Sequence, residues 1–213
     1  MEETMNDRFF NLPMDKQQRI INAAYKVFSQ NSYKKASMSE ISNEGGISKA
    51  LLFHYFTNKK ELYMYLWDYA VEITKDATTK FHVLDTHDFF EMLYRTLSAK
   101  CSLMKKCPHI YAFALNAYYE QLPEISNSVQ ESYNFASQNS HMKVFQKIDT
   151  SVFRQDIDLE FMYQEIMYAV DGYMLNMYRS MDINVSKIQS EMRQLIDFWK
   201  KVYTSRSINN YGT

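Results

Sequence analysis

Basic and aromatic side chains are concentrated between Ser37 and Leu62, where the chain reads SMSEISNEGGISKALLFHYFTNKKEL. Such side chains can donate hydrogen bonds to phosphates and base edges and can contact thymine methyl groups. Two short helical segments flank Gly45-Gly46, and the second segment carries a dense set of these residues. This is the pattern of a helix-turn-helix, in which the second helix enters the major groove of DNA.

Start and stop signals place the helices that must position these side chains. The spacing of a capping box occurs three times, at Asp15/Gln18, Ser37/Glu40 and Asn58/Glu61. Ser48 has the side chain of an N-cap, and Gly45-Gly46 falls where a sharp turn needs a positive φ. We therefore expect a three-helix head with a recognition helix at about 48–56. Residues 1–12 have no clear period and are expected to form a short arm.

Helical spacing also predicts which side of the recognition helix faces outward. Leu52 and Phe56 are four residues apart and are expected to face the core. Their neighbours then face out, namely Lys49, Ala50, Phe53 and His54.

The composition favours an all-α fold. Of 213 residues, 46% are hydrophobic, whereas glycine (4) and proline (3) are scarce. Scarce glycine and proline disfavour a sheet-rich fold with many tight turns and favour long helices. Tyr (17), Phe (14) and Met (14) are abundant, which suits core packing or a pocket for a bulky apolar ligand.

The charge is distributed unevenly along the chain. The net charge is −1, but residues 14–62 carry eight basic and four acidic residues, a balance of +4 that leaves −5 for the rest. A basic segment on an acidic body suits a protein that presents one face to phosphate. Two cysteines, Cys101 and Cys107, are too few for a disulfide framework or a zinc site and are expected to be free thiols. Without a signal-peptide pattern or a membrane-spanning run, we expect a cytoplasmic protein.

Two apolar seams near the C-terminus alternate at three and four residues, as in helices that pack at small crossing angles. They predict an antiparallel helix pair that forms a four-helix bundle with a second copy. The alternative is that each pair packs only within its own chain. The residues predicted for the dimer interface are Met162, Ile166, Tyr173, Met177, Ile188, Met192, Leu195 and Trp199.

Residues 15 to about 66 resemble the DNA-binding domain of the TetR (tetracycline repressor) family of bacterial transcriptional regulators. The resemblance rests on IINAAYKVFSQNSYKKAS followed by SEISNEGGISKALLFHYFTNKKEL, a specific signal over about a quarter of the chain. Positions that keep the family pattern include Ala23-Ala24, Tyr33, Ile41, Gly46, Ile47-Ser48, Leu52, Tyr55-Phe56, Lys59 and Leu62. The departures are Ser32 and Ala50 for frequent Gly, Ser42 for Ala, and Phe53 for Tyr. Loss of that Tyr hydroxyl removes one expected phosphate contact.

The resemblance implies a DNA-binding domain at 13–62 and a helical-bundle ligand-binding and dimerisation domain at 63–205. Together with helix geometry, it makes Lys49, Ala50, Leu51 and Phe53 the candidates for reading bases. The candidates for phosphate contacts are Ser37, Ser39, Ser48, His54, Tyr55 and Lys59. Those for a ligand pocket are Tyr69, Tyr94, Met104, Phe113, Tyr168, Glu165 and Asp171.

The implied function is that of a ligand-responsive regulator, specifically a repressor. It would bind a palindromic operator in double-stranded DNA as a homodimer and would be released by a bulky, largely apolar small molecule. No cofactor, metal or membrane partner is expected. One alternative is a DNA-binding regulator controlled by protein contacts without an effector. Another is an all-α enzyme, for which Ser102-x-x-Lys105 has a nucleophile spacing but lacks any companion motif.

Overall fold

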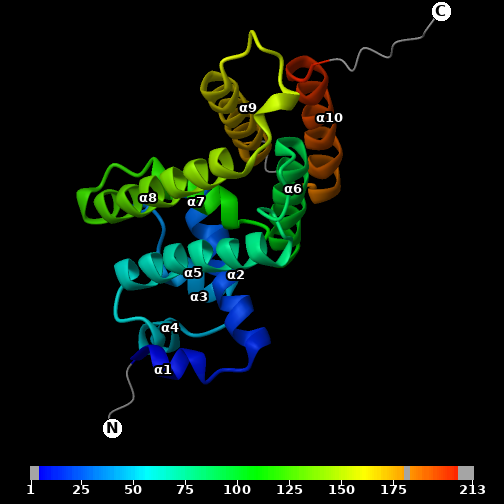
Figure 1. Cartoon of the computed structure of the whole chain (residues 1–213). Helices are drawn as coiled ribbons and strands as arrows, with labels where there is room; N and C mark the ends of the chain where they lie inside the picture. The colour runs from blue at the N-terminus through cyan, green and yellow to red at the C-terminus, as the bar shows by residue number, and fades with distance from the viewer. Residues whose placement is uncertain (1–4, 180–182, 206–213) are drawn as a thin grey trace, which may run out of the picture. The chain divides into compact units, whose positions relative to one another are not determined.

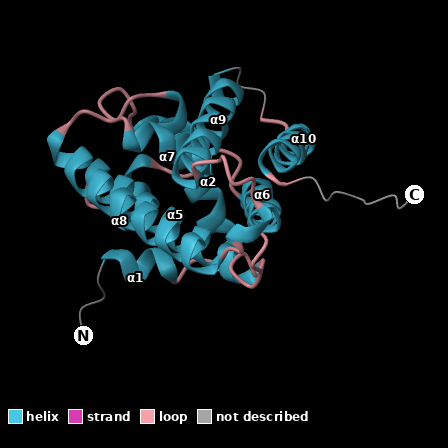
Figure 2. Ribbon diagram, turned by 45° about the horizontal axis from the view of Figure 1, so that its top comes forward, coloured by secondary structure: helices cyan, strands magenta, loops and turns pink. Residues whose placement is uncertain are grey.

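The computed structural model describes residues 5–179 and 183–205, and over these residues the regular structure is helical (Figures 1 and 2). The longer elements are α2 (Met14–Gln30), α5 (Lys59–Lys80), α6 (Phe89–Lys106), α8 (Pro123–Lys147), α9 (Leu159–Arg179) and α10 (Val185–Tyr203). The shorter ones are α1 (Met5–Phe10), α3 (Met38–Glu44), α4 (Lys49–Tyr55), α7 (Ile110–Tyr118) and the 3₁₀ turn η1 (Thr150–Val152). The all-α fold class is confirmed. No helix in these ranges is long and apolar enough to cross a membrane.

The chain packs into two compact units. The first comprises Met1–Asp76 and Ser102–Asn139, and the second comprises Ala77–Cys101 and Ser140–Thr213. The first unit is larger than the DNA-binding domain predicted at 13–62, because α1, α7 and parts of α5, α6 and α8 pack with it. Packing units are not functional domains, so the functional boundary at residue 62 stays a prediction.

The first unit is built around α2. Its apolar positions recur every three or four residues, and Ile20, Ala24 and Phe28 are all buried. Tyr25 is fully buried as well, and its hydroxyl donates a 2.9 Å hydrogen bond to the carbonyl of Leu66. Burial raises the pKa of Tyr25 well above its ordinary value, so the phenol stays protonated. The core around α2 is therefore aromatic, and the phenol at its centre is paired.

The predicted cap of α2 at Asp15 is wrong. The N-cap is Pro13, whose side chain can make no capping bond, and Asp15 lies in the first turn. Proline suits a helix start because its φ is already near the helical value. The capping-box spacing at Asp15 and Gln18 therefore coincides with a helix whose start depends on proline.

Part of the predicted arm, Met5–Phe10, is a helix, while residues 1–4 lie outside the described residues. Phe9 of α1 is fully buried, and its ring lies 5.9 Å from that of Tyr55 and 5.1 Å from that of Phe56. The Gln17 amide nitrogen donates to the carbonyls of Phe10 (3.0 Å) and Leu12 (2.8 Å), which satisfies the end of α1. Six residues are too few to show a helical period, and such a helix depends on tertiary packing.

The second unit contains the antiparallel pair of α9 and α10. Two hydrogen bonds join the helices, from Tyr173 Oη to Glu191 (2.7 Å) and from Tyr203 Oη to Glu165 (3.0 Å). The residue number rises along α9 as it falls along α10, so the predicted antiparallel arrangement is confirmed. Figure 1 shows both helices in the yellow-to-red part of the chain.

Candidate nucleic-acid interface

The turn between α3 and α4 sets the direction of α4. Gly46 has φ +64°, in the left-handed region where side chains are strained. Gly45 has an ordinary φ of −78°, but an added Cβ would lie 3.2 Å from the carbonyl oxygen of Ile41. The prediction of a positive φ is thus confirmed for Gly46. At position 45 glycine is favoured because the closely packed turn leaves little room for a side chain.

Serine caps fix the starts of α3 and α4 as predicted. The Ser37 hydroxyl accepts from the Glu40 amide (3.2 Å), and the Glu40 carboxylate accepts from the Ser37 amide (3.1 Å). The Ser48 hydroxyl accepts from the Leu51 amide at 3.1 Å. Ser48 is exposed and Ser37 is half-buried, so both helix starts have a solvent-accessible side. A phosphate contact by these serines, or by half-buried Ser39, stays a prediction.

A capping arrangement also starts α5, with one difference from the predicted box. The Asn58 side-chain oxygen accepts from the Glu61 amide at 2.9 Å. The Glu61 carboxylate accepts from the amide of Thr57, not of Asn58, at 2.7 Å. The cap is present, and its return bond reaches one residue further back.

One side of α4 is buried and the other is open. Leu52 and Tyr55 face the core, with exposed fractions of 0% and 4%. The exposed side chains are Lys49, Ala50, Phe53 and His54, which we call the reading face. The Lys49 ammonium lies 5.9 Å from the centre of the Phe53 ring, so a cation and an apolar ring project together. Leu51, predicted to read bases, is half-buried and packs against the core.

One of the predicted phosphate contacts, that of Lys59, disagrees with this geometry. The Lys59 ammonium donates to the carbonyls of Tyr33 (2.7 Å), Ala36 (2.9 Å) and Lys34 (3.3 Å). An ammonium has three donors, so Lys59 closes the loop between α2 and α3 and has none left for a phosphate. Tyr55 is nearly fully buried, and burial raises the pKa of its phenol. Its ring packs under α4, and a phosphate contact by its hydroxyl stays a prediction.

Arg8 is a candidate that the sequence reasoning missed. Its Nη1 lies 3.3 Å from Nδ1 and 3.4 Å from Nε2 of His54, which places a guanidinium beside the reading face. The sequence shows Arg8 followed by two aromatic residues, Phe9 and Phe10. That pattern indicates a helix anchored beside α4 only when the core that buries Phe9 is known. Lys34, Lys35 and Lys60 are also exposed in this unit and add positive charge.

The seam predicted for the dimer interface is mostly the core of the second unit. Its members with exposed fractions below 10% are Met162, Ile166, Met177, Ile188, Met192 and Trp199, while Tyr173 and Leu195 are half-buried. Side chains already covered within one chain cannot provide the surface that a partner covers. The apolar residues left exposed on α9 and α10 include Phe161 (69%), Tyr168 (74%) and Phe198 (59%).

The residues predicted for a ligand pocket are not gathered around one cavity. Phe113 and Met104 are buried core residues of the first unit, and Tyr168 is exposed on the second. Glu165 accepts the bond from Tyr203, and burial raises the pKa of Asp171 while nearby Lys100 opposes the rise. Tyr69 and Tyr94 line two separate hollows, one in each unit. Burial and the bond to the Asp197 carboxylate raise the pKa of Tyr94 to about 12.

The structure shows the surroundings of the two cysteines and of the serine–lysine pair. Cys101 and Cys107 are both buried, and neither forms a disulfide within the part of the chain that the structure describes. Ser102 and Lys105 lie on α6, where the serine is half-buried and the lysine is exposed. A lysine is activated for catalysis by burial in an apolar pocket or by a neighbouring cation. Lys105 is exposed, so burial does not activate it. Within residues 5–179 and 183–205, no group of three or more His, Cys, Asp or Glu side chains is placed to hold a metal ion.

Comparison with known proteins identifies the head. Residues 20–66, which run from α2 into α5, match the family described as bacterial regulatory proteins, tetR family. HTH-type transcriptional activator FasR from Mycolicibacterium smegmatis is 38% identical over 60 residues, which are 28% of this chain and 27% of FasR. The match thus spans about a quarter of the length of this curated relative.

Solved structures extend the likeness to the whole fold. The TetR family regulator PfmR from Thermus thermophilus superposes with a TM-score of 0.63 at 22% identity, over 86% of this chain and 94% of PfmR. The ketosteroid transcriptional regulator KstR2 of Mycobacterium tuberculosis superposes with a TM-score of 0.62 at 16% identity, over 92% of this chain and 98% of KstR2. At these identities the likeness concerns the fold alone. The chain is therefore similar to transcriptional regulators of the TetR family in sequence over residues 20–66 and in fold over most of its length.

Proposed function

We propose that the chain is a homodimer that binds a palindromic operator in double-stranded DNA, with α4 of each copy in the major groove. The observation that carries the proposal is the reading face itself, because α4 buries Leu52 and Tyr55 and leaves a lysine, a histidine and two apolar side chains exposed. Lys49 can donate to guanine O6 or N7, and Phe53 can contact a thymine methyl. Arg8, Lys34, Lys35 and Lys60 provide the phosphate contacts that hold α4 in register.

The proposed domain roles follow the sequence prediction. Residues 13–62 hold the DNA-reading head, and residues 63–205 hold regulation and dimerisation. Because Phe161 and Tyr168 are seven residues apart, they lie on one side of α9. The two bonds between α9 and α10 place Phe198 at about the level of Tyr168. We therefore move the proposed dimer interface from the buried seam to this exposed apolar set.

The proposed response is release from DNA by a bulky, largely apolar small molecule, so that the protein acts as a repressor in the cytoplasm. Two neighbours of the same fold carry names that refer to apolar compounds, namely a ketosteroid regulator and a fatty acid degradation regulator from Bacillus halodurans. The name of FasR refers to activation, but that match lies within the head and does not bear on the sign of regulation.

A selection experiment tests DNA binding directly. The full chain is used to enrich binding duplexes from a random pool, and fluorescence anisotropy then measures affinity for the enriched sequence. Lys49→Ala should weaken binding by about tenfold and relax the preference at one base position in each half-site. Lys143→Ala removes an exposed lysine of α8 and is the matched control. Equal affinities and preferences for the two variants would refute the assignment of Lys49, and failure to enrich any duplex would refute DNA reading.

A further inference from the structure

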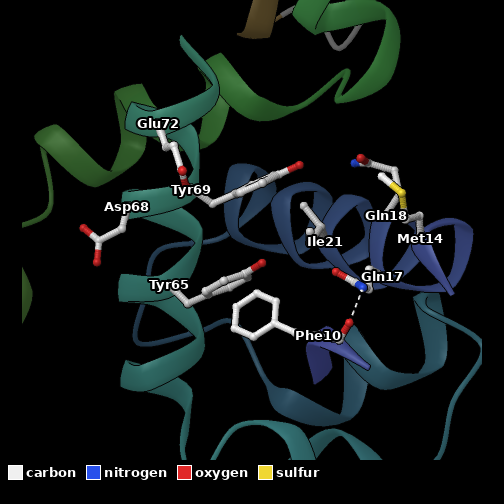
Figure 3. A pocket seen from close by; sticks show the side chains of 9 residues that line it. All are labelled: Phe10, Met14, Gln17, Gln18, Ile21, Tyr65, Asp68, Tyr69 and Glu72. Atoms are coloured by element: carbon white, nitrogen blue, oxygen red, sulfur yellow. Dashed lines mark hydrogen bonds between the residues drawn. The ribbon is translucent and has the colours of Figure 1, made fainter. Parts of the chain in front are cut away.

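A hollow in the first unit carries chemistry that the reading face does not use. It has a volume of about 310 Å³ and lies among α1, the start of α2 and the middle of α5. Figure 3 shows Tyr65 and Tyr69 pointing from α5 toward Phe10 and Ile21. Of the residues predicted for a ligand pocket, Tyr69 is the member that lines this hollow.

Aromatic rings form one wall of the hollow. The Tyr65 and Tyr69 rings are stacked with centres 6.0 Å apart and planes 13° apart. The Phe10 ring meets Tyr65 edge-on at 5.9 Å. Phe10 and Met14 are 52% and 85% exposed, which leaves apolar surface uncovered at the mouth. Ring faces carry negative potential, so such a wall attracts cations as well as apolar groups.

The charged groups of the hollow are all acidic. The carboxylates that line it are Glu72 and Asp68, and neither forms an ion pair within the part of the chain that the structure describes. Both residues are exposed, and partial burial raises the pKa of Asp68 above its ordinary value. Burial also raises the pKa of Tyr65 and Tyr69, so these phenols stay neutral. The Gln17 amide nitrogen is already engaged with Phe10 and Leu12, which leaves its oxygen as an acceptor.

We propose that this hollow binds a small organic cation with an aromatic or alkyl body. The cationic centre meets the faces of Tyr65 and Tyr69 and the carboxylate of Glu72, and the apolar body covers Phe10 and Met14. Asp68 has the smaller part, since Figure 3 shows it directed to the other side of α5. An anionic ligand of the same size would be repelled by the lining carboxylates, and a neutral one would gain no attraction from them.

A series of packed rings connects the hollow to the reading face. Through these rings a bound cation changes the affinity for DNA. The ring centre of Phe9 lies 5.6 Å from that of Tyr65 and 5.9 Å from that of Tyr55, and the ring centre of Tyr55 lies 5.9 Å from that of His54. Phe10 and Arg8 also share α1, a six-residue helix that depends on its contacts. A ligand that adds contacts to Phe10 stabilises α1 and holds Arg8 beside His54. This step rests on the proposed DNA binding and predicts that the cation strengthens it.

The first test is direct binding without DNA. Isothermal titration of the full chain uses benzyltrimethylammonium as the cation, benzyl alcohol as the neutral probe and phenylacetate as the anion. The cation should bind best, Glu72→Gln should weaken it by about tenfold, and Asp68→Asn should weaken it less. Glu131→Gln removes an exposed carboxylate of α8 and is the control. Circular dichroism verifies that each variant is folded. Absence of cation binding, or equal binding by the Glu72 and Glu131 variants, would overturn the site.

The second test measures the effect on DNA. Benzyltrimethylammonium should raise the affinity for the enriched duplex about threefold in the unmodified chain and should have no effect in Arg8→Ala. Cation binding that leaves DNA affinity unchanged would overturn the regulatory effect. A chain that binds the cation but no DNA would refute the proposed function and support the site, whereas a chain that binds DNA but no cation would refute the site alone.

Discussion

The head and the α9–α10 pair present the same kind of helical pattern, but the pattern means different things in the two regions. In the head, the apolar side of α4 is core and the polar side is the proposed contact surface, as the spacing predicts. In α9 and α10 the strongest apolar seam was assigned to a partner, yet Met162, Ile166 and Trp199 are buried within one chain. Periodicity therefore identifies which side of a helix is covered, but it does not identify what covers it.

The largest expected effect separates core from interface on α10. Trp199 is 3% exposed and Phe198 is 59% exposed. Trp199→Ala should lower the free energy of unfolding by about 3–5 kcal/mol through a cavity, and urea denaturation should show the loss at every protein concentration. Phe198→Asp should leave monomer stability within about 0.5 kcal/mol and weaken self-association in analytical ultracentrifugation. Weaker association for Trp199→Ala with unchanged stability would restore the original seam as the interface.

The second prediction distinguishes two adjacent lysines of the head. Lys59→Met removes the donor that satisfies three loop carbonyls and should cost about 1–3 kcal/mol in urea denaturation. Lys60→Met should leave stability within about 0.5 kcal/mol, because Lys60 is exposed. It should instead lower DNA affinity and reduce the salt slope by about one. If the variants exchanged these phenotypes, Lys59 would be the phosphate ligand after all.

The third prediction concerns two glycines with opposite roles. Gly46 has φ +64°, whereas Gly172 lies within α9 with no atom within 4 Å of an added Cβ. Gly46→Val should destabilise the fold by about 1–2 kcal/mol, since a side chain strains the left-handed conformation. Gly172→Ala should stabilise it by about 0.5–1 kcal/mol because glycine is a poor helix former. Thermal unfolding of both variants checks the signs. A stabilised Gly46→Val would mean that the turn can adopt another conformation.

Apart from the cap at Asp15, local signals were predictable from the sequence, and signals that depend on the packing of distant segments were not. Ser37 with Glu40, Ser48 and Gly46 act within a few residues of themselves, so their spacing sufficed. Lys59 was misassigned because the carbonyls it satisfies belong to residues 23 to 26 positions earlier in the chain. A lysine at a helix start has the same local sequence whether it meets a phosphate or a loop.

The pocket prediction failed for a related reason. The composition shows that aromatic and sulfur-containing side chains are plentiful, but it does not show which of them are buried in the core. Phe113 contacts the rings of Tyr25 and Tyr63 at 5.1 and 4.9 Å and is fully buried. Tyr65 was not nominated, although it lines the hollow beside Phe10. Phe10 lies far earlier in the chain, on a segment that was expected to be an irregular arm.

The smallest expected effect tests whether α1 belongs to the DNA-binding surface. Arg8 lies beside His54, and its neighbour Phe9 anchors α1 in the core. Arg8→Ala should therefore leave stability within about 0.5 kcal/mol while it reduces the salt slope of DNA binding by about one. Anisotropy titrations at several salt concentrations measure the slope, with Arg193→Ala, an exposed arginine of α10, as the control. An unchanged slope for Arg8→Ala would confine DNA contact to the head from α2 to α5 and would leave α1 a packing role only.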